Sequence, residues 1–162
     1  MSNPYDLIPT EEGFDFQTPD YHYITYFTDS ETALFKNVQL DSLIVIFGFD
    51  TRPEVKSMSK INGHVSRKFF DERIQATILL IIQKFFDANP HSILAIVCST
   101  KDDRQRQRKI VFSKWYKSIK MDTIVKTDLN YENVHLSYLY RKGHPFESML
   151  KEEIDILTFG KD

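Results

Sequence analysis

The segment Ser92–Ile119, SILAIVCSTKDDRQRQRKIVFSKWYKSI, decides how we interpret the chain. It begins with an uninterrupted apolar run that ends at Cys98, and such a run is typical of a buried interior strand. A polar turn follows, in which Asp102 and Gln105 have the spacing of a capping-box variant. The apolar spacing beyond that turn predicts a helix over Asp103–Ile119. The segment therefore predicts a buried strand followed directly by a helix.

A second helix is predicted before that strand, over Asp71–Ala88. Its isoleucines recur at helical spacing on one face, and Asn89-Pro90 ends it. The helix lies between two apolar strands, Ser42–Phe49 and Ser92–Cys98. Strands joined by a crossover helix usually pair in parallel, so we expect these two to be parallel neighbours.

The rest of the chain predicts strands in hairpins and a last helix. Thr51–Ser66 is the longest irregular stretch, and Glu31–Leu40 is ambiguous. Proline at the first helical position is favourable, and Pro145 opens the last helix. The further strands expected are Phe14–Thr18, His22–Thr28, Thr123–Thr127 and Val134–Arg141, the last two joined through Asn130. We predict an α/β protein of the mixed α+β kind, one domain over residues 1–162, with helices on the faces of a mixed, mostly antiparallel sheet.

Composition restricts the class of protein. The 162 residues carry a formal net charge of −2, so no strong positive field favours nucleic acid, and we expect no nucleic-acid partner. A single cysteine cannot form an intrachain disulfide, which suggests a reducing compartment. No apolar run is long enough to span a bilayer, and the first residues do not resemble a signal peptide. We expect a cytoplasmic protein, most simply bacterial, with no membrane partner.

The most informative candidate site lies at the start of the helix predicted after Cys98. On a helical wheel Arg108 falls at the centre of the apolar face, and Arg104 lies within it. With Ser99 and Thr100 these arginines could form an anion-binding pocket, because guanidinium groups suit phosphate and carboxylate. Alternatively, the arginines pair with neighbouring aspartates and are structural. Gln75, inside the apolar arc of the first helix, either lines the same crevice or bonds to a loop carbonyl.

Other kinds of chemistry have weak support in the sequence. The five histidines are scattered and show no zinc-type spacing, so we expect no metal site. No phosphate-binding loop or nucleophile-elbow motif occurs. Cys98 ends an apolar strand and is interpreted as a buried, inert thiol. A nucleophilic role would require a histidine beside it in space, which the sequence alone cannot show.

Four segments resemble a family of small uncharacterised bacterial proteins, which is known only as a domain of unknown function. The segments are Asn3-Pro4-Tyr5, Ile74–Pro90, Ile93–Tyr116 and Arg141–Phe146, and the resemblance extends over nearly the whole chain. The most specific part is Cys-x(3)-Asp-Asp-Arg-Gln-x(2)-Arg, which starts at Cys98. The family brings no established activity.

The order of the predicted elements is similar to the later part of the GNAT acetyltransferase fold. That resemblance implies acetyl-CoA binding at the start of the helix after the third strand, where the family has Gln/Arg-x-x-Gly-x-Gly/Ala. This chain has Asn62–Phe70, NGHVSRKFF, at that place. The second small residue is absent, and Phe69-Phe70 would crowd the backbone amides. No residue of the motif can be carried over.

We therefore expect a GNAT-like domain that acts as a non-catalytic binding or regulatory module. Its partner would be another protein or a small anionic ligand, and no cofactor would be needed. The alternative is an acyl-CoA-dependent N-acyltransferase with a degenerate cofactor loop and acetyl-CoA as its cofactor. The two hypotheses differ in whether acyl-CoA binds.

Overall fold

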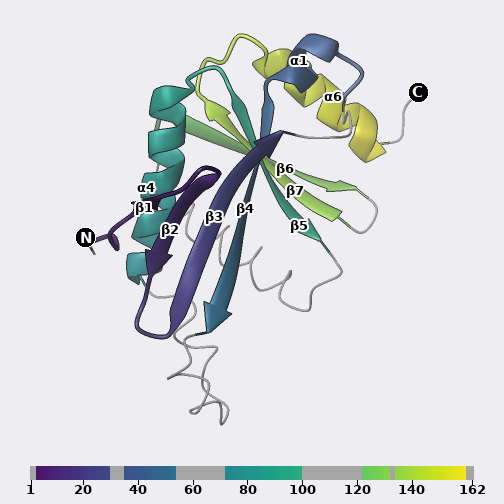
Figure 1. Cartoon of the computed structure of the whole chain (residues 1–162). Helices are drawn as coiled ribbons and strands as arrows, with labels where there is room; N and C mark the ends of the chain where they lie inside the picture. The colour runs from purple at the N-terminus through teal and green to yellow at the C-terminus, as the bar shows by residue number, and fades with distance from the viewer. Residues whose placement is uncertain (1–2, 30–34, 54–71, 100–121, 132–133, 160–162) are drawn as a thin grey trace. The chain divides into compact units, whose positions relative to one another are not determined.

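The computed structural model describes residues 3–29, 35–53, 72–99, 122–131 and 134–159. Within these residues the chain forms both strands and helices (Figure 1). The strands are β1 (Ile8–Pro9), β2 (Gly13–Gln17), β3 (Tyr21–Asp29), β4 (Ile44–Pro53), β5 (Ile93–Ser99), β6 (Ile124–Tyr131) and β7 (Val134–Arg141). The helices are α1 (Val38–Ser42), α4 (Glu72–Ala88) and α6 (Glu147–Phe159).

The described strands form one mixed sheet in the order β1-β2-β3-β4-β5-β7-β6. β4 and β5 are parallel, whereas β1–β2, β2–β3, β5–β7 and β6–β7 pair in the antiparallel sense. The α+β fold with a mostly antiparallel sheet is therefore confirmed, as is the parallel pair joined through a helix. The successive residues Ile93–Ile96 of β5 are all buried, so both faces of the strand are covered, which explains why its sequence is apolar without alternation.

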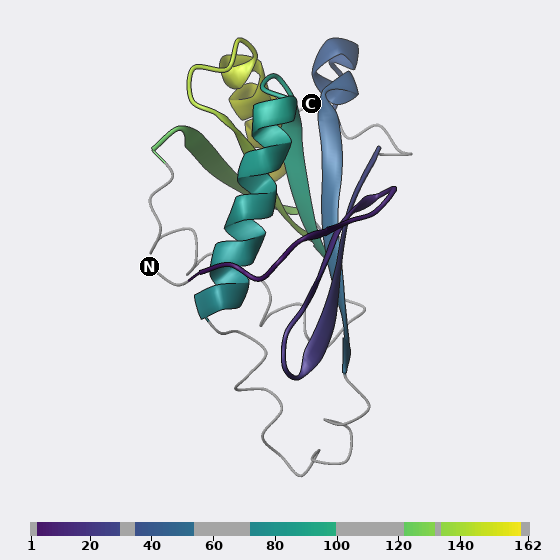
Figure 2. The same cartoon turned by 60° about the vertical axis from the view of Figure 1, so that its left-hand side comes forward.

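The chain divides into two compact units, and the first contains Met1–Phe27 and Gly48–Ala88. α4 buries Ile74, Ile78 and other residues of its predicted apolar face, because those residues recur every three or four positions. The N-terminal segment crosses this helix (Figure 2). There the backbone N–H of Tyr5 donates to Oγ1 of Thr77 at 2.8 Å, and the Arg73 guanidinium lies 3.9 Å from the centre of the Tyr5 ring.

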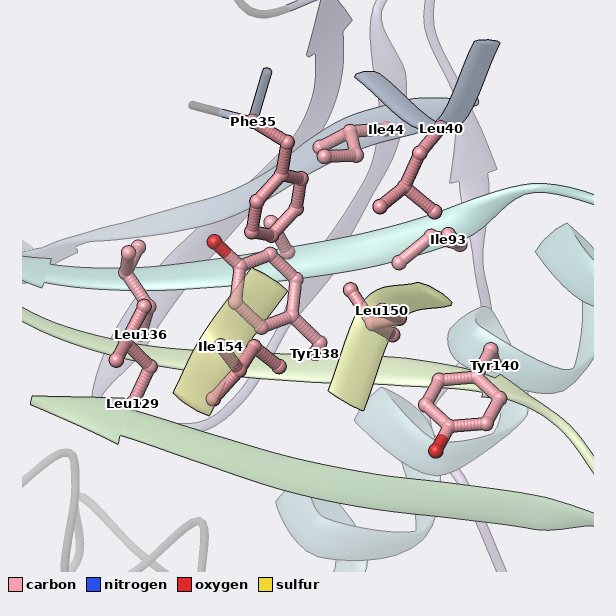
Figure 3. Packing of buried hydrophobic residues seen from close by; sticks show 11 residues of the cluster. Phe35, Leu40, Ile44, Ile93, Leu129, Leu136, Tyr138, Tyr140, Leu150 and Ile154 are labelled. Carbon is pink, nitrogen blue, oxygen red and sulfur yellow. The ribbon is translucent and has the colours of Figure 1, made fainter. Parts of the chain in front are cut away.

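The second unit contains Thr28–Phe47 and Asn89–Asp162, and its core lies between α6 and the strands β5, β7 and β6. Side chains of one face of β7 meet side chains of α6 and of the α1 segment there (Figure 3). The buried members of this cluster are Phe35, Leu40, Ile44, Ile93, Ala95, Leu129, Leu136, Tyr138, Tyr140, Leu150 and Ile154. Alternation along β7 therefore leaves the other face of the strand to His135, Ser137 and Leu139.

The structure corrects some predicted boundaries. β4 continues to Pro53, so the first residues of the stretch predicted to be irregular from Thr51 belong to a strand. β6 continues to Tyr131, so Asn130 pairs within the ladder and does not form the turn between the last two strands. The helix predicted over Asp103–Ile119 lies outside the described residues. No helix in the described part of the chain is both long and apolar enough to span a bilayer.

Candidate functional site

The parallel pair β4–β5 defines the edge of the sheet where a ligand is expected. The pair runs in register from Ile44 opposite Ile93 to Phe47 opposite Ile96. Ligands of sheets with parallel strands bind outside the carboxyl ends of those strands. In the second unit that edge is marked by the end of β5, at Ser99. Because β7 is antiparallel to β5 and β6 is antiparallel to β7, the start of β7 and the end of β6 lie at the same edge.

Three residues of polar or reactive type occupy one line of register across this edge. Cys98 on β5 is the register partner of His135 on β7, and His135 is the register partner of Asn130 on β6. We call these residues the thiol row. Each is one residue from the end of its strand at this edge, since the strands end or begin at Ser99, Val134 and Tyr131. The pairing places a cysteine, a histidine and an asparagine side by side on adjacent strands.

Two positions inward, on the same face of the sheet, the line of Ile96, Ser137 and Asp128 contains a short hydrogen bond. Oγ of Ser137 donates to Oδ1 of Asp128 at 2.6 Å, and Nζ of Lys126 lies 3.0 Å from Oδ2 of the same carboxylate. Ser137 is buried and the Lys126 side chain is only 8% exposed, whereas the Asp128 side chain is 45% exposed. Both carboxylate oxygens are therefore bonded, and the charges of the lysine and the aspartate balance.

The turn before α6 holds a second buried polar residue, His144. Its Nδ1 accepts the backbone N–H of Phe146 at 3.0 Å, and its Nε2 lies 2.8 Å from the carbonyl oxygen of His91. Because Nδ1 is an acceptor, Nε2 carries the proton and donates it to that carbonyl. His144 thus holds the turn that precedes α6 and ties it to the turn before β5. The helix itself begins at Glu147, so the prediction that Pro145 is its first residue is wrong by two positions. With both nitrogens bonded, this imidazole has a structural role.

A third histidine lies on the β2–β3 hairpin of the first unit. Nδ1 of His22 is 2.9 Å from Oε1 of Gln17, and Nε2 is 3.2 Å from Oδ2 of Asp15. The Gln17 amide nitrogen donates to two backbone carbonyls, which fixes its oxygen toward the histidine. Both ring nitrogens are again occupied, so His22 stabilises the hairpin and is not available as a ligand or a base.

The structure places only part of the anion pocket predicted from the sequence. Arg104, Arg108 and Thr100 lie outside the described residues. Ser99 is the last residue of β5, where it is the register partner of Val134, and so lies at the predicted carboxyl edge. Gln75 lies on α4, is half-buried and makes contacts within the protein. Among the described residues, no group of three or more histidine, cysteine, aspartate or glutamate residues could hold a metal ion.

The pairing of Cys98 with His135 is the feature that the sequence did not reveal. Alternation in Val134–Arg141 predicts that His135 and Ser137 share a face, and this is correct. The register between β5 and β7 is set by contacts between distant parts of the chain, so it cannot be read from either strand alone. The spacing of these residues in the sequence therefore gave no reason to expect Cys98 and His135 opposite each other on neighbouring strands.

Comparison with known proteins gives a family and no activity. Residues 70–151 match the model of a family of unknown function, DUF6169, over just over half of the chain. The matched range contains α4, β5, β6 and β7, and with them all members of the thiol row. No curated protein matches the chain. No solved structure matches it either.

Proposed function

We propose that this chain, which belongs to the DUF6169 family of unknown function, is a binding module for a small anionic ligand. The observation that supports this proposal is the parallel pairing of β4 with β5 across the crossover helix α4. It gives the sheet a carboxyl edge of the kind at which ligands bind in sheets with parallel strands. The arginine-rich segment follows directly on that edge in the sequence.

The proposed site contains the two arginines that helical spacing puts on the apolar stripe. Arg104 is closer to the expected helix start, where free backbone amides and the helix dipole favour an anion. Arg108 follows one turn later, so a phosphate or carboxylate could receive both guanidinium groups. Ser99 and Thr100 would contribute hydroxyl donors.

The second candidate is an acyl-CoA-dependent N-acyltransferase of the GNAT type, with acetyl-CoA as cofactor. It is favoured by the order of the strand β4, the helix α4, the strand β5 and the closing strands β6 and β7, although the short helix α1 separates β4 from the strands before it. It is disfavoured by the sequence NGHVSRKFF, which lacks the second small residue of the cofactor motif. We therefore favour binding without an acyl-CoA cofactor. For both candidates we propose the bacterial cytoplasm as the location, because the single cysteine suits a reducing compartment.

Thermal melts in the presence of phosphate-bearing compounds test the proposal. A ligand that binds only the folded chain raises the melting temperature, and we expect such a shift in the wild type. Arg104→Ala should abolish the shift, whereas Arg106→Ala should retain it, because Arg106 points away from the apolar stripe on the helical wheel. An unchanged shift in Arg104→Ala, or no shift with any anion in the wild type, contradicts the proposal. Calorimetric titration with acetyl-CoA decides the second candidate, and micromolar binding would favour it.

A further inference from the structure

We propose that the exposed surface where α1 meets α6 binds a cationic amphipathic helix of a partner protein. We call this surface the α1–α6 patch, and define it by one residue of α1 and four residues of α6: Val38, Met149, Glu152, Glu153 and Ile156. The proposal goes beyond anion binding, because the patch takes a ligand of the opposite charge and uses neither the carboxyl edge of the sheet nor the arginines. All members of the patch lie in the second unit.

The short helix α1 presents an apolar side chain to solvent beside α6. Val38 is 80% exposed, whereas Leu40, two residues later, is fully buried in the core cluster that also contains residues of α6. Nδ2 of Asn37, the residue before Val38, lies 3.9 Å from Sδ of Met149, so the two helices are in contact here (Figure 1). Met149 is itself 37% exposed. Ile8 is the one other exposed large apolar side chain in the described part of the chain, so two of these three residues lie together.

One stripe of α6 extends this exposed surface along the helix. The four α6 residues of the patch recur at the spacing i, i+3, i+4 and i+7, which places them on one side of the helix. Leu150 and Ile154 lie on a different side and are buried in the core. In the stripe Glu152 is exposed, and Glu153 and Ile156 are half-buried. The patch therefore has two carboxylates between two apolar residues of α6, with Val38 next to the first of them.

The negative charge of this stripe is not balanced within the helix. α6 carries four acidic side chains and one lysine. That lysine, Lys151, has its Nζ 3.0 Å from Oε1 of Glu147, so it is already paired. Among the described residues, neither Glu152 nor Glu153 has an ion-pair partner. Two exposed apolar contacts and two uncompensated carboxylates thus lie on the same side of one helix.

This combination of charge and exposure selects the chemistry of the partner. A neutral apolar partner would remove water from Glu152 and Glu153 without pairing them, which costs free energy. Nucleic acids and anionic membranes would be repelled by the same carboxylates. A helix with lysine or arginine beside its apolar residues covers Val38 and Met149 and also pairs both carboxylates. Methionine suits such a contact, because its flexible side chain adapts to the shape of the partner.

Fluorescence anisotropy of the full chain with a defined peptide tests the patch. The probe is a fluorescein-labelled peptide of leucine and lysine alone, with leucine at helical spacing, and the comparison peptide has glutamate in place of every lysine. We expect the wild type to bind the lysine peptide, more weakly as salt is added, and not to bind the glutamate peptide. Glu152→Gln with Glu153→Gln should weaken binding about tenfold, because two exposed ion pairs are lost. Val38→Ser and Met149→Ser should each weaken it about fivefold, because less apolar surface is buried.

The first unit provides matched controls for both kinds of change. Glu11 and Glu12 are adjacent, exposed carboxylates, so Glu11→Gln with Glu12→Gln removes the same charge from a different place. Ile8→Ser removes an apolar side chain that is 52% exposed. Both controls should change the affinity for the lysine peptide by less than about twofold. Circular dichroism melts verify that the variants fold, which we expect because Val38, Met149 and Glu152 are exposed.

Three results would overturn the proposal. The wild type does not bind the lysine peptide, or binds both peptides equally well. Alternatively, the control variant Glu11→Gln with Glu12→Gln loses as much affinity as Glu152→Gln with Glu153→Gln, which would mean that the peptide responds to the total charge of the protein and not to the patch. Finally, sedimentation equilibrium detects a dimer that Met149→Ser dissociates, which would mean that a second copy of the chain covers the patch in place of a cationic helix.

Discussion

Tyr138→Phe should make the protein more stable. Tyr138 is fully buried in the core of the second unit, where its ring lies 5.5 Å from that of Phe35 (Figure 3). Its hydroxyl oxygen is buried and has no hydrogen-bond partner. A buried polar group without a partner costs about 1–3 kcal/mol. The substitution removes that group and keeps the ring, so we expect the free energy of unfolding to rise by about 1 kcal/mol once the small void left by the oxygen is included.

The matched control is Tyr140→Phe, on the same face of the same strand. Tyr140 is equally buried, but its hydroxyl lies 3.4 Å from Oγ1 of Thr127 and forms a long hydrogen bond. Removing that hydroxyl should lower the free energy of unfolding by about 0.5 kcal/mol, which is the low end of the usual contribution of a hydrogen bond to stability. Urea denaturation of both variants therefore should give changes of opposite sign. If Tyr138→Phe destabilises the protein more than Tyr140→Phe does, the Tyr138 hydroxyl has a partner and the reasoning is wrong.

The difference between Tyr138→Phe and the wild type should also depend on pH. Burial, and then the negative charge of Asp41, raise the pKa of Tyr138 far above its ordinary value of about 10. Above about pH 10 the unfolded chain loses this proton while the folded chain keeps it, so the stability contributed by Tyr138 falls by about 1.4 kcal/mol per pH unit. Below that pH both states are protonated and the contribution is constant. The advantage of Tyr138→Phe should therefore grow only above about pH 10.

Three further substitutions test the packing and the turns. Ile78→Ala should lower stability by about 2–5 kcal/mol, measured by urea denaturation, because Ile78 is fully buried on α4. Gly13→Ala should lower it by about 1–3 kcal/mol, because the new Cβ would meet the carbonyl group of Thr25 in the paired strand; an unchanged midpoint would contradict this contact. His144→Asn should keep a bond to the backbone N–H of Phe146 and lose the bond to the carbonyl of His91, so it should cost less than His144→Ala in the same assay; equal losses would show that the bond to Phe146 contributes nothing.

The elements predicted correctly are those whose sequence repeats with a clear period. The apolar spacing of Asp71–Ala88 predicted α4, and the structure has Glu72–Ala88. The apolar run ending at Cys98 predicted an interior strand, and β5 is paired on both sides. In these segments burial and local pattern agree, so the sequence alone is sufficient to place them.

β6 was predicted too short for a physical reason. Asp128 and Asn130 favour turns when they are considered locally, because their side chains compete for backbone hydrogen bonds. In the structure both lie in the ladder with β7, and Asp128 is bonded by Ser137 and Lys126. Cross-strand contacts therefore override the local preference. The same error assigned Asn130 to a turn and not to the strand position opposite His135.

The polar residues described on β6 and β7 have a structural explanation. Polar residues on a strand next to buried positions lower stability unless they have partners. Ser137, Asp128 and Lys126 satisfy one another, so their presence is explained by structure alone. The thiol row lies two positions further along these strands, close to their ends, and its members are register partners of one another.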